Sequence, residues 1–315
     1  MKINRVSIFV LNYNGIALMR ECLPSLVEAG RRSPVPVRLV VIDNRSTDAS
    51  VSFVRENFPT FEISVAEAND FLCSFNAYVA ADTGDVALLL NNDIKVDPDF
   101  LAPLITLFEK NEDAFFASPL CWDFSGQHYE GGLSRLMNRA GIMGTRSVMP
   151  PLPADGTPLL TASIGAAIAV RRDRFLALGG FDRLFLPGIL EDLDLCYRGW
   201  KRGWRGYLVR ESMAYHKGQA SFQPAFGAYR VRKMACCHTF LFMWKNLSDF
   251  TLLAEHALLL LPRLAWSLVR GDLAFGAGLM EALGRLSEAM ERRRGAQEGA
   301  VLSDREILKL TGAPS

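Results

Sequence analysis

Short apolar segments alternate with amphipathic segments through the first hundred residues, and this alternation constrains the fold more than any other feature. Apolar runs typical of strands cover Val6–Leu11, Val37–Ile42, Phe61–Val65 and Val86–Leu90. Segments with helical spacing are Ile16–Ala29, Ser46–Asn57, Leu72–Ala81 and a fourth from Asp97 to about Lys110. Alternating strands and helices indicate βαβ units, and continuous apolar strands indicate helices on both faces of the sheet. We therefore predict an α/β fold with a mostly parallel sheet flanked by helices.

The rest of the chain changes character twice. Gly, Pro, Ser and Arg interrupt any periodicity from Cys121 to Leu160, which predicts a long irregular segment. Regular structure is expected again in a strand at Ile164–Val170, a helix at Asp173–Leu178, a helix from Glu191 and a strand near Tyr207–Arg210. After Ser221 the sequence is helical in pattern and rich in Leu, Phe, Trp and Arg. We therefore divide the chain into an α/β domain over residues 1–221 and a helical region over residues 222–315.

Composition and charge exclude several classes of protein. The 315 residues carry a formal net charge of +1, which argues against a dedicated nucleic-acid binder. Half of the residues are hydrophobic, which excludes a disordered chain. None of the six cysteines forms a C-x-x-C pair, so no zinc ribbon is predicted. The cysteine pattern, the absence of a signal peptide and the absence of an apolar run of about 18 to 20 residues together predict a cytoplasmic protein.

Polar residues follow three of the expected strands at the point where each strand ends. The first strand leads into Asn12-Tyr13-Asn14, the second into Asp43-Asn44, and the fourth into residues 91–93, which read Asn-Asn-Asp. Asn and Asp are common in turns and helix caps, so each cluster alone favours a structural role. Ligands of open parallel sheets bind outside the carboxyl ends of the strands. Three clusters at three such ends therefore predict a ligand site.

The usual nucleotide-binding motifs are absent from the sequence. No G-x-G-x-x-G follows the first strand, and no G-x-x-x-x-G-K-[ST] or G-x-S-x-G occurs. What remains is a sheet edge with carboxylates and amides, which suits a diphosphate chelated by a divalent metal ion. Mg²⁺ and Mn²⁺ prefer oxygen ligands, and Mn²⁺ also accepts imidazole. Asp93, directly after a buried strand, is the expected metal ligand.

A second group of candidates opens the helix expected from Glu191. Glu191 and Asp192 precede the buried face of this helix, and Asp194 and Arg198 are spaced to form an ion pair along it. The two leading carboxylates either complement the helix dipole alone or act as a general base. The dipole lowers the pKa of a carboxylate, whereas a base benefits from a raised pKa. A dry site or a neighbouring carboxylate would restore the higher value.

His216 is the histidine whose sequence context suits a ligand. It follows an expected strand and is flanked by Lys217, Gly218 and further polar residues. His238 and His256 lie in apolar helical sequence, where packed or interfacial roles are more common, and His128 lies in the irregular segment.

These segments, in this order, resemble the family-2 glycosyltransferases of the GT-A fold, and in particular bacterial rhamnosyltransferases and galactofuranosyltransferases. The resemblance runs from Val6 to about Ser221 and rests on the series NYNG, DNRSTD, NND, GGFD, EDLDLCYR and H-x-x-x-x-S. It implies a GT-A catalytic domain and an inverting hexosyltransferase. Such an enzyme moves one sugar from a nucleotide-diphosphate sugar to an acceptor hydroxyl.

The resemblance also implies roles for individual residues. Donor binding is implied for the strand-end residues and one later asparagine: Asn12, Tyr13, Asn14, Asp43, Asn44, Asn69 and Asn92. Asp93 stands at the last position of the family's D-x-D motif and would hold Mn²⁺ or Mg²⁺ together with His216. Asp192 matches the family's catalytic base, with Glu191 as the alternative.

One motif departs from the family pattern. Related sequences carry N-x-G-F-x-G-G-N before the fourth strand, whereas residues 69–76 read Asn-Asp-Phe-Leu-Cys-Ser-Phe-Asn here. The asparagines remain, and all three glycines are replaced, which predicts an altered donor pocket. The Q-x-x-R-W motif of processive synthases is missing, which favours transfer of a single sugar.

The helical region carries an uneven charge. Residues 225–270 contain 6 basic and 2 acidic side chains, interleaved with Trp, Phe and Leu. This pattern suits either peripheral binding to the cytoplasmic face of a membrane or a helical layer that covers the catalytic domain or forms a homodimer. The expected acceptor is a glycan or a lipid-linked molecule in cell-surface glycan or glycolipid synthesis.

The sequence leaves one alternative function open and argues against another. The altered glycine motif fits a non-catalytic protein that binds nucleotide sugars and retains the fold. A nucleotidyltransferase would need a Gly-rich loop with Lys or Arg after the first strand, and residues 12–15 lack it.

Overall fold

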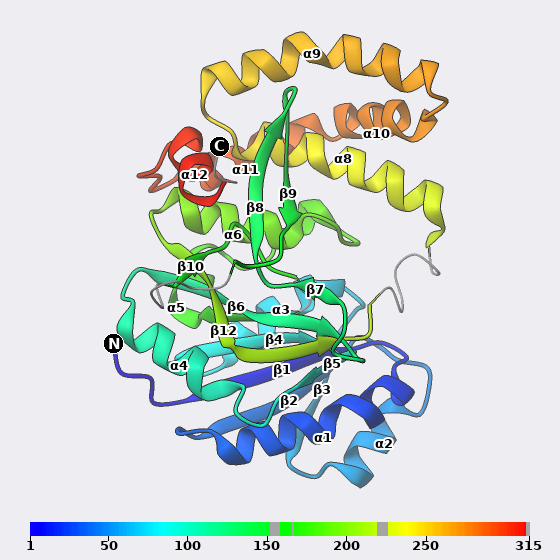
Figure 1. The fold of residues 1–315 in the computed structure, drawn as a ribbon. Helices are drawn as coiled ribbons and strands as arrows, with labels where there is room; N and C mark the ends of the chain where they lie inside the picture. The colour runs from blue at the N-terminus through cyan, green and yellow to red at the C-terminus, as the bar shows by residue number, and fades with distance from the viewer. Residues whose placement is uncertain (152–157, 166, 219–225, 313–315) are drawn as a thin grey trace.

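A mixed ten-stranded sheet forms the centre of the described part of the chain (Figure 1). The structure is a computed structural model that describes residues 1–151, 158–165, 167–218 and 226–312. The strands along the sheet, in spatial order, are β10 (Leu159–Leu160), β12 (Arg205–His216), β6 (Ala114–Asp123), β11 (Ala167–Arg171), β4 (Val86–Asn91), β1 (Val6–Asn12), β2 (Val37–Asp43) and β3 (Phe61–Val65). Two short strands pair outside this order, β5 (Ile94–Val96) with β12 and β7 (Tyr129–Gly131) with β6.

Strands β1 to β4 pair in parallel, as the alternating sequence predicts. The helices that follow them are α1 (Ile16–Arg32), α2 (Ser50–Asn57), α3 (Phe75–Ala81) and α4 (Leu101–Lys110). Successive residues of a strand point to opposite faces, so Phe9 enters one core while Ile8 and Val10 enter the other. The sheet is therefore buried on both faces, which confirms the predicted α/β fold.

Three helix starts differ from the prediction. Helix α2 begins at Ser50 instead of Ser46, because the side chains of Ser46 and Asp48 bond to the neighbouring loop. A short 3₁₀ helix at Phe71–Ser74 precedes α3. Helix α4 begins at Leu101, after β5 and a turn at residues 97–100.

The second half of the sheet mixes antiparallel and parallel pairs, whereas a mostly parallel sheet was predicted. β11 runs antiparallel to both of its neighbours, β4 and β6. β12 is parallel to β6, and a register shift between Val209 and Met213 lets its last residues pair with β5. The sequence pattern did not predict β6 and predicted only part of β12.

The segment expected to be irregular contains strands. β8 (Ser134–Arg139) and β9 (Ile142–Ser147) form an antiparallel hairpin, which reaches from the sheet toward helix α9 in Figure 1. Half-buried side chains and glycines give this hairpin no clear alternation in the sequence, so its composition resembled that of a loop.

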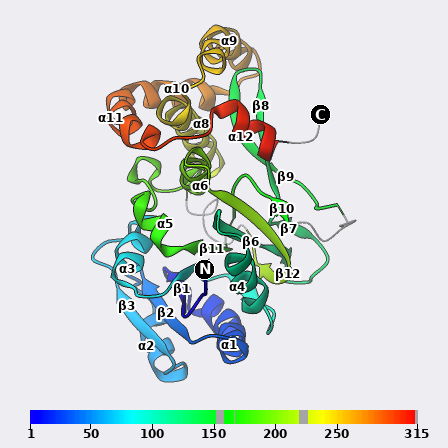
Figure 2. The same cartoon turned by 90° about the vertical axis from the view of Figure 1, so that its left-hand side faces the viewer.

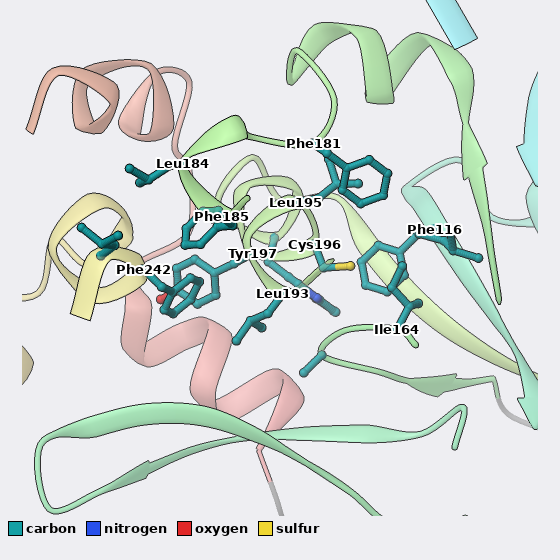
Figure 3. Packing of buried hydrophobic residues seen from close by; sticks show 14 of the residues in the cluster. Phe116, Ile164, Phe181, Leu184, Phe185, Leu193, Leu195, Cys196, Tyr197 and Phe242 are labelled. Carbon is teal, nitrogen blue, oxygen red and sulfur yellow. The ribbon is translucent and has the colours of Figure 1, made fainter. Parts of the chain in front are cut away.

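Helices form a layer on one side of the sheet, as predicted for the region after Ser221, although Ser221 itself lies outside the described residues (Figure 1). They are α8 (Ala228–Asn246), α9 (Phe250–Val269), α10 (Leu273–Gly284), α11 (Leu286–Gln297) and α12 (Asp304–Thr311). Helix α6 (Glu191–Lys201) lies between this layer and the sheet (Figure 2). Figure 3 shows side chains of α6, including Leu193, Leu195 and Tyr197, packed among Phe116, Phe185 and Phe242.

Buried charges join α6 to the helical layer. The Asp194 carboxylate, which is fully buried, pairs with Arg198 at 2.8 Å and with Lys245 of α8 at 2.7 Å. Asn246 donates a further hydrogen bond to it at 2.8 Å. The predicted pair within α6 is therefore confirmed, and it belongs to a larger network.

A second network links α6 to α12. The buried Asp304 carboxylate accepts a hydrogen bond from the Tyr197 hydroxyl at 2.6 Å and pairs with Lys201 at 2.6 Å. It also accepts the backbone N–H groups of Ser248 and Asp249, each at 2.6 Å. Residues from α12 and from the loop before α9 thus fix the far end of α6.

Candidate functional site

The side chains at the ends of β1, β2 and β4 bond to one another. Asn12 Nδ2 donates to Asp43 Oδ1 at 3.0 Å, and Asn92 Nδ2 donates to Asn12 Oδ1 at 2.8 Å. Ser46 closes the cluster, because its hydroxyl donates to Asp43 Oδ1 at 2.6 Å and its backbone N–H to Oδ2 at 2.9 Å. Asn12 and Asp43 are buried. The three predicted strand ends therefore do meet, and these two side chains also hold the loops together.

The other predicted donor-binding residues surround this cluster. Asn14 Oδ1 accepts the backbone N–H of Thr47 at 2.7 Å, and Tyr13 is exposed at the surface. The amide nitrogen of buried Asn44 donates to the Phe71 carbonyl at 3.2 Å, while its Oδ1 has no hydrogen-bond partner. Asn69 Oδ1 accepts the N–H of Phe71 at 3.2 Å. Asn44 Oδ1 is thus a buried acceptor with unused capacity beside the strand ends.

Asp93 and His216 lie side by side, as the metal prediction requires. The pairing of His216 with Ile94 between β12 and β5 sets this proximity. His216 Nε2 lies 3.3 Å from Asp93 Oδ2, and His216 Nδ1 lies 3.6 Å from Glu130 Oε2. Burial would lower the pKa of His216, but Asp93 and Glu130 outweigh burial and raise it.

These residues fit a divalent metal ion by their chemistry. Asp93 Oδ1 is buried without a hydrogen-bond partner, and an imidazole nitrogen lies beside the same carboxylate. Carboxylate oxygen with imidazole nitrogen is a donor set that Mn²⁺ accepts. Among the described residues, no group of three His, Cys, Asp or Glu side chains is arranged around a common metal position. The protein thus offers two ligands, and the remaining positions would be left for a substrate and water.

A cavity of about 270 Å³ opens beside His216 and contains both base candidates. Its polar lining includes Asn91, Glu191, Asp192 and His216, and its apolar lining includes Leu72, Phe75, Leu89, Ile164, Ile168, Phe181 and Ile189. Asn91 ends β4 and Glu191 begins α6. The fold therefore brings the predicted base residues to the same edge of the sheet as the predicted metal ligands.

Both carboxylates at the start of α6 have raised pKa values. Burial raises the pKa of Glu191, and the neighbouring charge of Asp192 raises it further. Burial also raises the pKa of Asp192, although hydrogen bonds from the backbone N–H groups of Leu193 and Asp192 oppose the shift. Glu191 Oε2 is buried and has no hydrogen-bond partner. The helix dipole would lower the pKa of both carboxylates, but burial outweighs it, and both pKa values are raised.

The loop before α6 is anchored from the helical layer. Ile189 and Leu190 both adopt positive φ angles of 73°, an unusual backbone conformation for such side chains. His238 of α8 forms a hydrogen bond between its Nδ1 and the Ile189 carbonyl at 3.0 Å. His238 is packed as its sequence context predicted, and it positions the residues that lead to Glu191 and Asp192.

The motif that lost its glycines retains part of the family geometry. Phe71 stands where the pattern has glycine, and its φ of 51° is in the left-handed region. Phe75 replaces another glycine, and its ring lines the cavity. Asn76 bonds to both backbone groups of Phe181, accepting its N–H at 2.9 Å and donating to its carbonyl at 2.8 Å. The replacement of glycine by Phe75 therefore adds an aromatic ring to the wall of the cavity.

The first part of the chain is similar to a known protein family. Residues 7–152 match the model described as glycosyl transferase family 2. This match covers slightly less than half of the 315-residue chain. The family-2 region contains β1 to β4, the strand-end cluster and Asp93, whereas Glu191, Asp192 and His216 follow it in the chain.

One curated protein is similar in sequence to part of this chain. The uncharacterized protein y4gI of Sinorhizobium fredii (strain NBRC 101917 / NGR234) is 25% identical over 232 residues, which cover 69% of this chain and 25% of the relative. The chain therefore spans a quarter of the length of that curated relative.

Solved structures share the GT-A fold at low sequence identity. The crystal structure of GalNAc-T7 with UDP, GalNAc and Mn²⁺ has a TM-score of 0.60 at 17% identity, over 79% of this chain and 49% of that chain. The mannosyltransferase PcManGT from Pyrobaculum calidifontis, in complex with GDP-Man and Mn²⁺, has a TM-score of 0.54 at 18% identity. The match covers 99% of this chain and 86% of that chain. S. aureus TarS 1-349 has a TM-score of 0.55 at 15% identity, and the match covers 94% of this chain and 88% of that chain. The fold outside the family-2 region is thus shared as well.

Two residues of the site were not singled out from the sequence. Glu130 lies in the segment that resembled a loop, and no local signal marks it as a neighbour of His216. Ser46 belongs to the DNRSTD motif, so its position three residues after Asp43 was an available signal.

Proposed function

We propose that this chain is an inverting glycosyltransferase that moves a single sugar from a nucleotide-diphosphate sugar to an acceptor hydroxyl. The observation that carries the proposal is the cavity shared by Glu191, Asp192 and His216, with Asp93 3.3 Å from the histidine. The match of residues 7–152 to the glycosyl transferase family 2 model supports it. The complexes of GalNAc-T7 with UDP and of PcManGT with GDP-Man support a nucleotide-sugar donor.

In this mechanism Asp192 is the general base, with Glu191 as the alternative. The carboxylate takes the proton of the acceptor hydroxyl while that oxygen forms a bond to the anomeric carbon from the side opposite the leaving group. The bond from the anomeric carbon to the diphosphate oxygen breaks, and the electron pair leaves with the diphosphate. A raised pKa suits this role, because a base works best when its pKa lies near the working pH.

The remaining residues bind and orient the substrates. Asp93 and His216 would hold Mn²⁺ or Mg²⁺, which would stabilise the negative charge of the departing diphosphate. The strand-end cluster and the free acceptor of Asn44 would receive the nucleoside part of the donor. The apolar wall at Leu72 and Phe75 would limit the size of the donor sugar. We place this activity, as a hexosyl transfer, in the cytoplasmic synthesis of cell-surface glycans or glycolipids.

A transfer assay with isosteric variants tests the proposal. Wild type is incubated with UDP-, GDP- and dTDP-sugars and Mn²⁺, and nucleoside diphosphate release is measured with candidate glycan and lipid-linked acceptors. We expect Asp192→Asn to lower kcat by about 10²- to 10⁴-fold while the Kd for the nucleotide changes less than about twofold. Glu191→Gln is the matched comparison at the adjacent position. Full turnover by Asp192→Asn would remove Asp192 from the role.

A protein that binds nucleotide sugars without catalysis is the second candidate. The observation that favours it is the loss of the three glycines, with Phe75 at one of their positions in the cavity wall. Tight binding of a nucleotide sugar, with neither transfer nor hydrolysis across all donors and metals, would support this candidate against the enzyme.

A further inference from the structure

The outermost helices expose a large apolar surface. Helices α9 and α10 lie at the end of the molecule opposite α1 and α2 (Figures 1 and 2). We define the α9–α10 surface by six side chains, each at least 62% exposed: Leu258, Leu261, Trp266, Val269, Leu273 and Met280. Apolar clusters of this kind on a protein surface usually mark a site of interaction.

Helix α9 is held along the protein instead of projecting from it. By length and composition it could cross a membrane. Only 17% of its most apolar 18-residue stretch is buried in the protein, so most of that stretch is exposed. His256 forms a hydrogen bond between its Nδ1 and the Gly141 carbonyl at 2.8 Å. Arg263, near the middle of the helix, donates from Nε to the Ala140 carbonyl at 2.7 Å. A helix that spans a bilayer would lose these bonds and would place Arg263 in hydrocarbon.

Arginines line a cavity at the edge of this surface. The cavity, of about 390 Å³, is lined by Arg232, Arg263 and Arg270 together with Trp266, Ser267, Asp272 and Phe275. Arg232 pairs with Asp272 at 2.8 Å. The Arg270 side chain is exposed, and its guanidinium group forms no hydrogen bond or ion pair with the described residues. A guanidinium group with free donors, next to two others, matches the geometry of a phosphate.

The acidic residues near this surface are already paired. Asp272 binds Arg232, and Glu281 binds Lys233 at 2.7 Å. Glu255 accepts a hydrogen bond from Asn138 at 2.7 Å. A second copy of this chain, docked through the same surface, would therefore bring no free carboxylate to Arg270.

We propose that the α9–α10 surface binds an anionic phospholipid bilayer, with α9 in the plane of the interface and a lipid phosphate at the arginine-lined cavity. The exposed leucines and Trp266 supply the apolar contact, as in helices that lie in the headgroup region. The arginines supply attraction to anionic headgroups, which salt weakens. The proposal concerns binding alone and is independent of the sugar-transfer reaction.

Vesicle flotation tests the proposal on the full chain. Wild type is mixed with vesicles of phosphatidylcholine alone or with 30% phosphatidylglycerol, at low and high salt. We expect binding to the anionic vesicles at low salt and little binding to the neutral ones. Arg270→Gln should weaken binding by about fivefold, and the double variant Leu258→Gln/Leu261→Gln by about tenfold or more. All variants should keep the circular dichroism spectrum of wild type, since the changed side chains are exposed.

Two control variants change exposed residues that lie outside the α9–α10 surface. Arg294→Gln on α11 removes an exposed arginine elsewhere, and Val301→Gln replaces an exposed apolar side chain outside the surface. Both should bind vesicles like wild type. No binding at low salt, or equal losses in the control variants, would overturn the proposal. A dimer in sedimentation velocity that Leu258→Gln/Leu261→Gln converts to monomer would overturn it in favour of a second copy.

Discussion

Replacing Lys245 by methionine tests how the helical layer supports α6. Lys245 Nζ lies 2.7 Å from Asp194 Oδ1 and 2.6 Å from Asp182 Oδ2, and the lysine is buried. Methionine keeps most of the side-chain volume and removes the charge. Removal of one partner from a buried ion pair costs about 3 to 5 kcal/mol. Because Arg198 and Asn246 still bind Asp194, we expect the lower end, about 3 kcal/mol, in the free energy of unfolding.

The assay is urea unfolding followed by circular dichroism between pH 3 and pH 8. Burial alone would raise the pKa of Asp194, but Arg198 and Lys245 outweigh burial and lower it. This lowered pKa stabilises the fold above the unfolded value of about 3.9, and the stabilisation is lost as the pH falls through the lower folded value. The difference between wild type and Lys245→Met should therefore be largest at neutral pH and shrink in acid.

Lys309→Met is the matched control, because Lys309 is an exposed lysine on α12. We expect it to change the free energy of unfolding by less than about 0.5 kcal/mol. A loss in Lys245→Met no larger than in this control, or a loss that does not vary with pH, would refute the idea that the buried charges join α8 to α6.

Three further predictions concern the site. Gly15→Ala should weaken nucleotide binding, because an added Cβ would lie 2.0 Å from Asn92 Nδ2 and 2.6 Å from Asn12 Oδ1. The affinity is measured by calorimetry against wild type. Unchanged affinity would count against the strand-end cluster as the nucleotide site. Burial raises the pKa of Glu191 to about 8, and a carboxyl with a raised pKa destabilises the fold as the pH rises above its unfolded value. Glu191→Gln should therefore be more stable than wild type by about 3 to 4 kcal/mol at pH 8 and equally stable near pH 4 in urea unfolding. Asp93→Ala should lose the Mn²⁺-dependent part of nucleotide binding while binding without metal persists, and identical titrations with and without Mn²⁺ would contradict the metal assignment.

The sequence predicted the parts of the fold whose signal is local. The apolar runs of β1 to β4 and the helical spacing from Glu191 are visible within a few residues of each other, so the elements and their polar ends were found. The carboxyl ends of parallel strands meet at one edge, which is why Asn12, Asp43 and Asn92 could be placed together.

Contacts between distant residues were beyond the sequence pattern. The β8–β9 hairpin was mistaken for a loop because its half-buried residues do not alternate in polarity. Lys245 and Asp194 pair across 51 positions of the chain, and Glu130 reaches His216 from a segment without periodicity. Such pairs depend on the way in which separate elements pack. The sequence around each residue gives no indication of its partner.

The second buried network sets an order on folding during synthesis. Helix α6 leaves the ribosome about a hundred residues before Asp304, the carboxylate that Lys201 and Tyr197 require. Until then the ammonium group of Lys201 has no carboxylate to pair with, so its burial is unfavourable and the packing of α6 stays incomplete. In a nascent chain, the helix that begins with Glu191 and Asp192 therefore reaches its final packing only after α12 has emerged. Premature termination before residue 304 would therefore release a chain in which Lys201 and Tyr197 of α6 lack their carboxylate partner.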